Sequence, residues 1–238
     1  MITETRRAKF TAKVMGTNAS LHIDDVCDGV VANEAWNAVH LLMCEHEKKF
    51  STFLRDSEIS RINRGEVHLL DASPEVLEVF DACTWLEHVS NGAFSAYRPD
   101  GLLDPAGFVK GWVAEKASRC LAHFGLSNWY LSVGGDIQTS GRQANGDLWR
   151  AGVVDPYDVS RVRCYVDIPE NWALATSGTA ARGNHIWNVH NESQFVASFT
   201  VVGPHLMWAD AFATAGFAMG VDGIEWVEKF PDYSAFTL

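Results

Sequence analysis

The stretch Trp208-Ala-Asp-Ala-Phe-Ala-Thr-Ala-Gly-Phe-Ala-Met-Gly220 consists almost wholly of small and apolar residues, and it predicts a helix packed into the protein core. Asp210 and Thr214 are four residues apart, so both side-chain oxygens lie on one face of that helix. A carboxylate and a hydroxyl are the hard oxygen ligands that Mg²⁺ prefers, and Mg²⁺ normally takes only one or two protein carboxylates. The alternative is a structural role, with Asp210 capping the helix start and Thr214 bonded to its own backbone. The spacing alone leaves both interpretations open.

Strand and helix patterns alternate outward from this helix without a linker. Residues 8–14 and 20–23 predict a hairpin joined through Met15-Gly16-Thr17-Asn18, because Gly and Asn tolerate turn conformations. Further strands are predicted at residues 129–133, 149–154, 162–168 and 195–202, and helices at residues 35–50, 74–90 and 109–124. The pattern indicates an α+β fold of largely antiparallel sheets with packed helices. We expect residues 1–238 to form a single compact unit of two intimately packed lobes.

Length and composition narrow the class of protein. A chain of 238 residues, 47% of them hydrophobic, can bury a large core. A formal net charge of −11 argues against a nucleic-acid partner, because no basic stripe is available for phosphates. The five cysteines are odd in number and contain no C-x-x-C pair, so they predict thiols in a reducing compartment. With no signal peptide, lipobox or long apolar run, we expect a cytoplasmic protein without membrane insertion.

A second group of candidate residues lies in Asp104-Pro-Ala-Gly-Phe-Val-Lys-Gly111, at the start of a predicted helix. Ala106 and Gly107 let a ligand approach the backbone, and the amides at a helix N-terminus favour phosphate. Lys110 would add a mobile positive charge. The segment is not a P-loop, because the G-x-x-x-x-G-K-[ST] pattern is absent. An Asp-Pro turn followed by a helix with a solvated Lys is the plainer interpretation.

Two more segments combine small and polar residues. Leu131-Ser-Val-Gly-Gly-Asp-Ile137 predicts a strand that runs into a turn, which either approaches a ligand or forms an ordinary hairpin. In Ala173-Leu-Ala-Thr-Ser-Gly-Thr-Ala-Ala-Arg-Gly-Asn-His-Ile186, the Ser177 hydroxyl could hold a phosphate oxygen and His185 could move a proton. His185 could equally be a hydrogen-bonded structural residue beside Trp187. No Ser-His-acid order or Cys-His pair can be asserted, so protease or esterase chemistry has little support.

Taken in order, these segments resemble the ApbE-type FAD:protein FMN transferase family over nearly the whole chain. The residues that carry the resemblance are Met15-Gly16-Thr17, Phe50-Ser51-Thr52-Phe53, Ser57-Glu58-Ile59-Ser60-Arg61-Ile62-Asn63, Gly92-Ala93-Phe94, residues 104–111, 133–137 and 175–178, His185-Ile186 and residues 209–214. The resemblance implies that the protein removes FMN from FAD with Mg²⁺, attaches it through a phosphoester to a Ser or Thr hydroxyl of an acceptor flavoprotein, and releases AMP. Some members of the family mainly hydrolyse FAD to FMN and AMP.

The resemblance also implies roles for individual residues. The Mg²⁺ ligands would be Asp210, Thr214 and the backbone carbonyl of Gly107, and His185 matches a histidine held to matter for the chemistry. The FAD site would be lined by Met15, Phe53, Ala93, Phe94, Ser95, Asp104, Lys110 and Ile186, to which Ser177 is added as a phosphate contact. The departures from the family pattern are Gly107 for Ala, Phe53 for Tyr, Ser95 for Asp, and Asn188-Val189-His190-Asn191 for an Asp-Pro turn.

The implied mechanism is a metal-assisted displacement at a phosphorus atom of the FAD pyrophosphate. Lys110 and helix-terminal amides would stabilise the leaving AMP. Either His185 or Asp210 would accept the proton of the incoming hydroxyl, and the sequence does not choose between them. We therefore expect an FAD:protein FMN transferase, with an FAD pyrophosphatase or a non-catalytic FAD-binding protein as alternatives. The joint presence of Asp210, Thr214 and Lys110 favours an enzyme over a binding protein.

Overall fold

The structure, a computed structural model, describes residues 5–178 and 196–238. Its main feature is a seven-stranded sheet in the order β1-β2-β3-β4-β7-β8-β9, in which every neighbouring pair is antiparallel. The strands are β1 Thr5–Val14, β2 Thr17–Asp28, β3 Trp129–Val133, β4 Asp136–Ser140, β7 Ala173–Gly178, β8 Ser198–Gly203 and β9 Ser234–Thr237. The helices are α1 Gly29–Phe50, α2 Glu58–Asn63, α3 Pro74–Val89, α4 Ala106–Ser118, α6 Leu206–Met219 and α7 Gly223–Val227.

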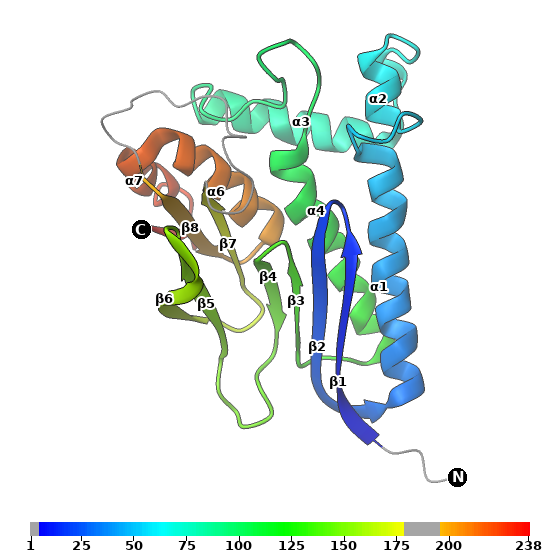
Figure 1. Cartoon of the computed structure of the whole chain (residues 1–238), viewed down its shortest axis with the longest axis vertical. Coiled ribbons are helices and arrows are strands. Elements are labelled where there is room, and N and C mark those ends of the chain that lie inside the picture. The colour runs from blue at the N-terminus through cyan, green and yellow to red at the C-terminus, as the bar shows by residue number, and fades with distance from the viewer. Residues whose placement is uncertain (1–4, 179–195) are drawn as a thin grey trace.

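Helices α1, α4 and α6 pack on one face of this sheet (Figure 1). Strand β3 shows why: Trp129, Leu131 and Val133 are buried and alternate with half-buried residues, so one face of the strand is apolar. The main core lies between that face and the helices, and it includes Val39 of α1 and Val113 of α4, both fully buried. This arrangement confirms the α+β, largely antiparallel fold expected from the sequence.

A separate two-stranded sheet, β5 Trp149–Asp155 with β6 Asp158–Ile168, covers part of the other face. Ala151 and Ile168 of this hairpin form a small second core with Leu174 of β7 and Val202 of β8. The hairpin therefore packs against the half of the large sheet that contains β7 and β8.

The large sheet has its shortest strand pairing where its two halves meet. Strands β4 and β7 pair only through Ile137 with Leu174 and Gln138 with Ala173. Helices α4 and α6 pack against each other across the same line, and we call this line the seam (Figure 1). The two packed lobes expected from the sequence are thus joined by one continuous sheet and one helix pair.

Most predicted elements are present, with shifts at their ends. The predicted hairpin at the N-terminus and the long helix after it are confirmed as β1, β2 and α1. Helix α4 starts at Ala106, three residues earlier than predicted, and ends in a 3₁₀ turn, Arg119–Phe124, that is closed by Gly125 at φ +71°. Elements α2, α7 and β9 were not predicted, and residues 173–178, read as part of a ligand-binding stretch, form strand β7.

Two further expectations concern the class of protein. Among the described residues, no helix is both long and apolar enough to cross a membrane. All five cysteines lie in the described part of the chain and are unpaired thiols. Burial raises the pKa of the Cys83 thiol, so this side chain is held in its protonated, unreactive form.

Candidate active site

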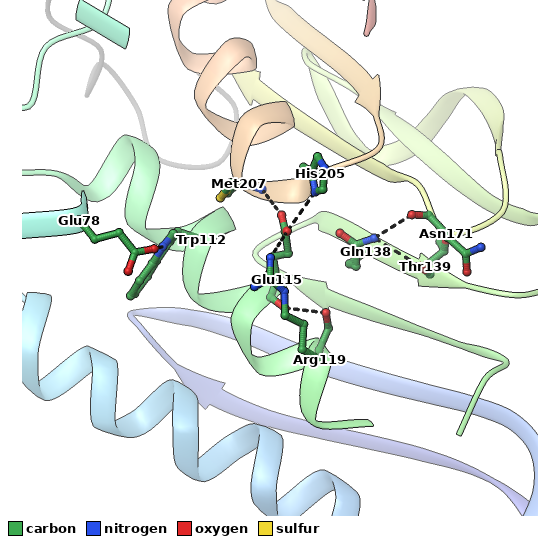
Figure 2. A network of polar contacts seen from close by, with 10 residues as sticks. Glu78, Trp112, Glu115, Arg119, Gln138, Thr139, Asn171, His205 and Met207 are labelled. Atoms are coloured by element: carbon green, nitrogen blue, oxygen red, sulfur yellow. Dashed lines mark hydrogen bonds and ion pairs between the residues drawn. The ribbon is translucent and has the colours of Figure 1, made fainter. Parts of the chain in front are cut away.

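Helix α6 is held at its N-terminus by a carboxylate from α4. The N-cap residue of α6, His205, makes no side-chain hydrogen bond to the first turn of the helix. Glu115 of α4 takes that role: its Oε2 accepts from the Met207 amide at 3.1 Å, and its Oε1 lies 3.2 Å from His205 Nδ1 (Figure 2). Trp112, one turn earlier in α4, donates to Glu78 of α3 at 2.9 Å. The Glu115 contacts thus fix the relative position of α4 and α6 at one end of the seam, and the Trp112 contact joins α4 to α3.

One turn further along α6, Asp210 contacts α4 directly. The Gly111 amide donates to Asp210 Oδ2 at 2.8 Å, and Asp210 is only 2% exposed. A β-carbon on Gly111 would stand 2.7 Å from the Asp210 β-carbon and 2.8 Å from the Leu206 carbonyl oxygen, so only Gly allows this approach. In a regular helix the Gly111 amide would bond to the Gly107 carbonyl alone. Asp210 is therefore not the cap of its own helix but a link from α6 to α4.

Thr214 lies one turn beyond Asp210, beside Gly107. A β-carbon on Gly107 would stand 3.2 Å from Thr214 Cγ2 and 3.7 Å from its Oγ1. Thr214 Oγ1 is also 3.2 Å from Ser177 Oγ of β7, and the two hydroxyls share a hydrogen bond. The structure thus brings together the three residues predicted to bind Mg²⁺, Gly107, Asp210 and Thr214, and adds Ser177 to them.

Lys110 reaches the same place from α4. Its ammonium pairs with Asp136 Oδ2 and lies 3.0 Å from Asp210 Oδ1. Asp136 is only 1% exposed, and its Oδ1 accepts from the Thr176 amide of β7 at 3.0 Å. Asp136 was not among the predicted site residues. Its signal in the sequence was that it is the single ionisable residue of the segment 131–137.

The loop before α4 is anchored on both sides. Asn63 of α2 bonds twice to Leu103: its Nδ2 donates to the Leu103 carbonyl at 2.9 Å, and its Oδ1 accepts from the Leu103 amide at 2.8 Å. The Asp104 amide donates to the Ala96 carbonyl at 2.7 Å, and Asp104 Oδ1 accepts from the Ala106 amide at 3.3 Å. These contacts hold the segment in which α4 begins, just ahead of Gly107 and Lys110.

The other residues predicted to line the FAD site are spread around this loop. Ala93 and Phe94 are 2% and 3% exposed. A β-carbon on Gly107 would stand 3.1 Å from Phe94 Cε2, so the Phe94 ring packs against the first turn of α4. Ser95 Oγ accepts from the Tyr97 amide at 3.1 Å. Phe53, in the segment between α1 and α2, is 96% exposed, which leaves its ring open to a ligand.

Met15 lies in the turn between β1 and β2, at the Lys110 end of the sheet. The Gly134 amide donates to the Asn18 carbonyl at 2.9 Å, so this turn adjoins the turn between β3 and β4. A β-carbon on Gly134 would stand 3.1 Å from Thr17 Oγ1 and 3.5 Å from Lys110 Cδ. Met15 thus belongs to the rim of the same region.

His185 and Ile186, together with the departure at residues 188–191, lie outside the described residues.

The donor set suits a hard cation. The Asp210 carboxylate, the Thr214 hydroxyl and the Gly107 carbonyl are all oxygen donors, and Mg²⁺ usually retains several waters beside one or two carboxylates. Asp210 Oδ2 accepts a hydrogen bond from the Gly111 amide, so Oδ1 is the oxygen that would face a cation. Across residues 5–178 and 196–238, no three His, Cys, Asp or Glu side chains gather as they would for Zn²⁺. The residues present therefore fit Mg²⁺ with a phosphate ligand.

A cavity of about 270 Å³ lies at the other end of the α4 and α6 pair, lined among others by Glu115, Gln138 and His205 (Figure 2). It contains none of the predicted site residues. We place the candidate active site at the Lys110 end of the seam, where charges and oxygen donors converge, and not at this cavity.

Comparison with known proteins shows the family to which this fold belongs. A profile of the ApbE family matches residues 15–97 and 96–237, which is nearly the whole chain. This chain belongs to the ApbE family. The FAD:protein FMN transferase of Vibrio cholerae is 28% identical over 61% of this chain and 48% of that protein, and that of Haemophilus influenzae is 20% identical over 95% and 85%. The match to the Escherichia coli K12 FAD:protein FMN transferase, 26% identical, covers 62% of this chain and 47% of that protein. The matched part thus spans about half the length of the Vibrio and Escherichia relatives.

Solved ApbE structures have the same fold. The flavin transferase ApbE from Vibrio cholerae superposes with a TM-score of 0.77 at 20% identity, covering 98% of this chain and 97% of the other. The ApbE protein from Thermotoga maritima superposes with a TM-score of 0.80 at 19% identity, covering 98% and 94%. At this level of identity the likeness establishes the ApbE fold.

Proposed function

We propose that this ApbE-family protein is an Mg²⁺-dependent FAD:protein FMN transferase, which cleaves FAD and attaches FMN through a phosphoester to a Ser or Thr hydroxyl of an acceptor flavoprotein. The observation that carries the proposal is the convergence of three side chains at the seam: the Lys110 ammonium lies 3.0 Å from Asp210 Oδ1, and Thr214 follows Asp210 by about one helical turn of α6. The names of the relatives support the same activity.

Each chain residue has a distinct task in this proposal. Lys110 would pair with a pyrophosphate oxygen of FAD, because its side chain is only 14% exposed and its charge is little screened there. Asp104, whose Oδ1 accepts from the Ala106 amide, would hold the first turn of α4 beside the same phosphates. Phe53, with its exposed ring, would stack on the flavin or the adenine.

Asp210, Thr214 and the Gly107 carbonyl would hold the cation, which when bound neutralises charge on the pyrophosphate. Ser177 would orient Thr214 through the hydrogen bond between their hydroxyls. Gly111 would keep Asp210 Oδ1 directed toward the cation by occupying Oδ2. The site is therefore arranged by contacts that exist before any ligand binds.

The reaction is a displacement at the FMN phosphorus. The acceptor hydroxyl oxygen forms a bond to that phosphorus, the bond from phosphorus to the AMP oxygen breaks, and AMP leaves with the electron pair. Asp210 has one oxygen bonded to Gly111 and the other facing Lys110, so we assign the hydroxyl proton to His185. With water in place of the acceptor hydroxyl, the same steps would give FMN and AMP.

The test is incubation of the purified protein with FAD and Mg²⁺, with and without a flavin-free acceptor domain that contains a flavinylation threonine. A covalently fluorescent acceptor together with AMP is the expected result. FMN and AMP in equal amounts, with no labelled acceptor, would identify an FAD pyrophosphatase. Intact FAD that co-purifies with the protein would identify a binding protein and contradict the proposal. The Asp210→Asn variant serves as the control for metal-dependent turnover.

A further inference from the structure

Three charged side chains are buried together at the seam: Asp136 of β4, Lys110 of α4 and Asp210 of α6. Their side chains are 1%, 14% and 4% exposed. Two carboxylates and one ammonium leave the group with one net negative charge. Buried charges are costly unless paired, so this arrangement needs a reason beyond stability.

Asp136 is fixed too firmly to act as a cation ligand. Its Oδ1 accepts from the Thr176 amide at 3.0 Å, and its Oδ2 pairs with Lys110. It lies where the pairing of β4 with β7 ends, one residue beyond the pair Ile137 and Leu174. The carboxylate thus takes the place of a backbone acceptor for Thr176 and presents its second oxygen to Lys110.

Asp210 has a single oxygen to offer a cation, and Lys110 faces that oxygen. Gly111 holds Oδ2, and the Lys110 ammonium lies 3.0 Å from Oδ1. A cation bound by Asp210 and Thr214 would repel the ammonium at that distance. Lys110 and the cation therefore compete for Asp210 Oδ1.

We propose that Asp136 is a positioning residue that draws the Lys110 ammonium off Asp210 Oδ1 and so keeps Asp210 open to a divalent cation. The inference rests on the proposed function in that it takes Asp210 as the cation's carboxylate. Asp136 gives Lys110 a second buried acceptor, so the ammonium stays near the pyrophosphate site when the cation takes Asp210. Its negative charge also offsets the repulsion between the ammonium and the cation.

Asp136→Asn isolates this role. An Asn side chain keeps an acceptor for the Thr176 amide, but its Nδ2 would face the Lys110 ammonium, donor against donor. Lys110 would then have only Asp210 as a charged partner in the group. We expect the affinity for a divalent cation to fall by about tenfold, the scale typical of groups behind metal ligands. Lys110→Met removes the competitor, and we expect it to raise that affinity by about threefold or more.

The experiment is a Mn²⁺ titration followed by electron paramagnetic resonance, without FAD, on the full chain. Mn²⁺ takes the same oxygen donors as Mg²⁺. The samples are the parent, Asp136→Asn, Lys110→Met, the double variant, and Asp210→Asn as the control that loses the site. Because Asp136 acts through Lys110, the loss caused by Asp136→Asn should be much smaller in the Lys110→Met background. Melting temperatures without metal report folding separately.

Three outcomes among the variants would overturn the inference. One is an Asp136→Asn protein that binds Mn²⁺ as the parent does, and another is an equal loss in both Lys110 backgrounds. The third is a Lys110→Met protein that binds no more tightly than the parent, which stands as a test even if Asp136→Asn folds poorly. A parent that binds no Mn²⁺ contradicts the metal assignment and this inference together. FAD cleavage by the parent, measured independently, tests the proposed function alone.

Discussion

The backbone amide of Gly111 donates to Asp210 Oδ2 at 2.8 Å, although the two residues are 99 positions apart in the chain. This bond ties α4 to α6 at the point where the candidate ligands gather. It also orients the carboxylate, because it leaves Oδ1 as the oxygen that faces Lys110. The packing of the two helices and the geometry of the site therefore depend on the same contact.

Gly111→Ala should damage both the fold and the site. The added β-carbon would stand 2.7 Å from the Asp210 β-carbon and 2.8 Å from the Leu206 carbonyl oxygen, neither of which can move alone. We expect about 1–3 kcal/mol of destabilisation from this overpacking. The matched control is Gly107→Ala, whose β-carbon would meet only side-chain atoms at 3.1 Å and 3.2 Å. Thermal melts should separate the two, and a Gly111→Ala protein as stable as the parent would refute the close packing.

Asp210→Asn should abolish turnover while sparing the fold. The Asn side chain keeps an oxygen to accept from the Gly111 amide but loses the charge that would hold the cation. FAD cleavage should fall by at least about a hundredfold, because groups merely behind metal ligands already contribute about 10–100-fold. Asp210→Ala would in addition lose the bond to Gly111, so it should also melt at a lower temperature. If the Asp210→Asn protein cleaves FAD at the parental rate, Asp210 is not a ligand of the metal.

Thr214→Val should have a smaller effect on turnover than Asp210→Asn. Valine keeps the shape of the side chain beside Gly107 and removes a neutral oxygen only. We expect about a tenfold loss in Mg²⁺ affinity, measured from the Mg²⁺ dependence of FAD cleavage. Ser177→Ala is the companion variant, because it removes the hydroxyl that bonds Thr214 and leaves the Thr214 oxygen in place. We expect Ser177→Ala to lose less Mg²⁺ affinity than Thr214→Val. A larger loss for Ser177→Ala would indicate that Ser177 is the ligand.

Glu115→Ala should lower stability without changing the chemistry. The variant leaves the Met207 amide at the start of α6 without its acceptor, which costs about 1–3 kcal/mol. At about 2–4 °C per kcal/mol for a chain of this size, the melting temperature should fall by several degrees. Asp210 is held independently by Gly111, so FAD cleavage per folded molecule should persist well below the melting temperature. Arg119→Ala is the control, because that side chain is 67% exposed and should matter little.

Glu75 provides a prediction about pH. The hydrogen bond from Lys49, aided by Lys116, lowers the pKa of the Glu75 carboxyl below its ordinary value. A lowered folded-state pKa means that the stabilisation is present above the unfolded value near 4.5 and is lost as the pH falls through the folded value. Glu75→Gln should therefore melt about 2–4 °C below the parent at pH 7. The difference should shrink as the pH drops below 4.5, and a difference that grows in acid would refute the assignment.

The control for that measurement is Glu66→Gln. Glu66 pairs with Arg64 in an exposed ion pair, which is screened by solvent. Its removal should change the melting temperature little at any pH. A loss at Glu75 that exceeds the loss at Glu66 would place the effect in the contacts among α1, α3 and α4.

Local patterns were enough to predict much of this protein. The hairpin turn at Met15, the long helix α1 and the cap at Gly125 follow from residue types within a few positions of one another. The spacing of Asp210 and Thr214 likewise placed both side chains on one face of α6 before any fold was known. Strands β7 and β9 were missed because short segments of small residues, or a strand of four residues, carry little periodic signal.

The sequence by itself determined the long helices, the hairpin turn and the types of ligand atom, because these depend on neighbours in the chain. The tertiary structure decided which of those atoms meet. Gly111 and Asp210 meet across the seam, Ser177 and Thr214 meet on its α6 side, and Asp136 and Lys110 meet on its α4 side, each pair through packing between segments separated in sequence. No local periodicity encodes such pairs, because each depends on how closely two separate backbones approach. Asp136 is the clearest case: a hairpin acid in the sequence becomes the buried partner of Lys110 only where β4 and β7 part.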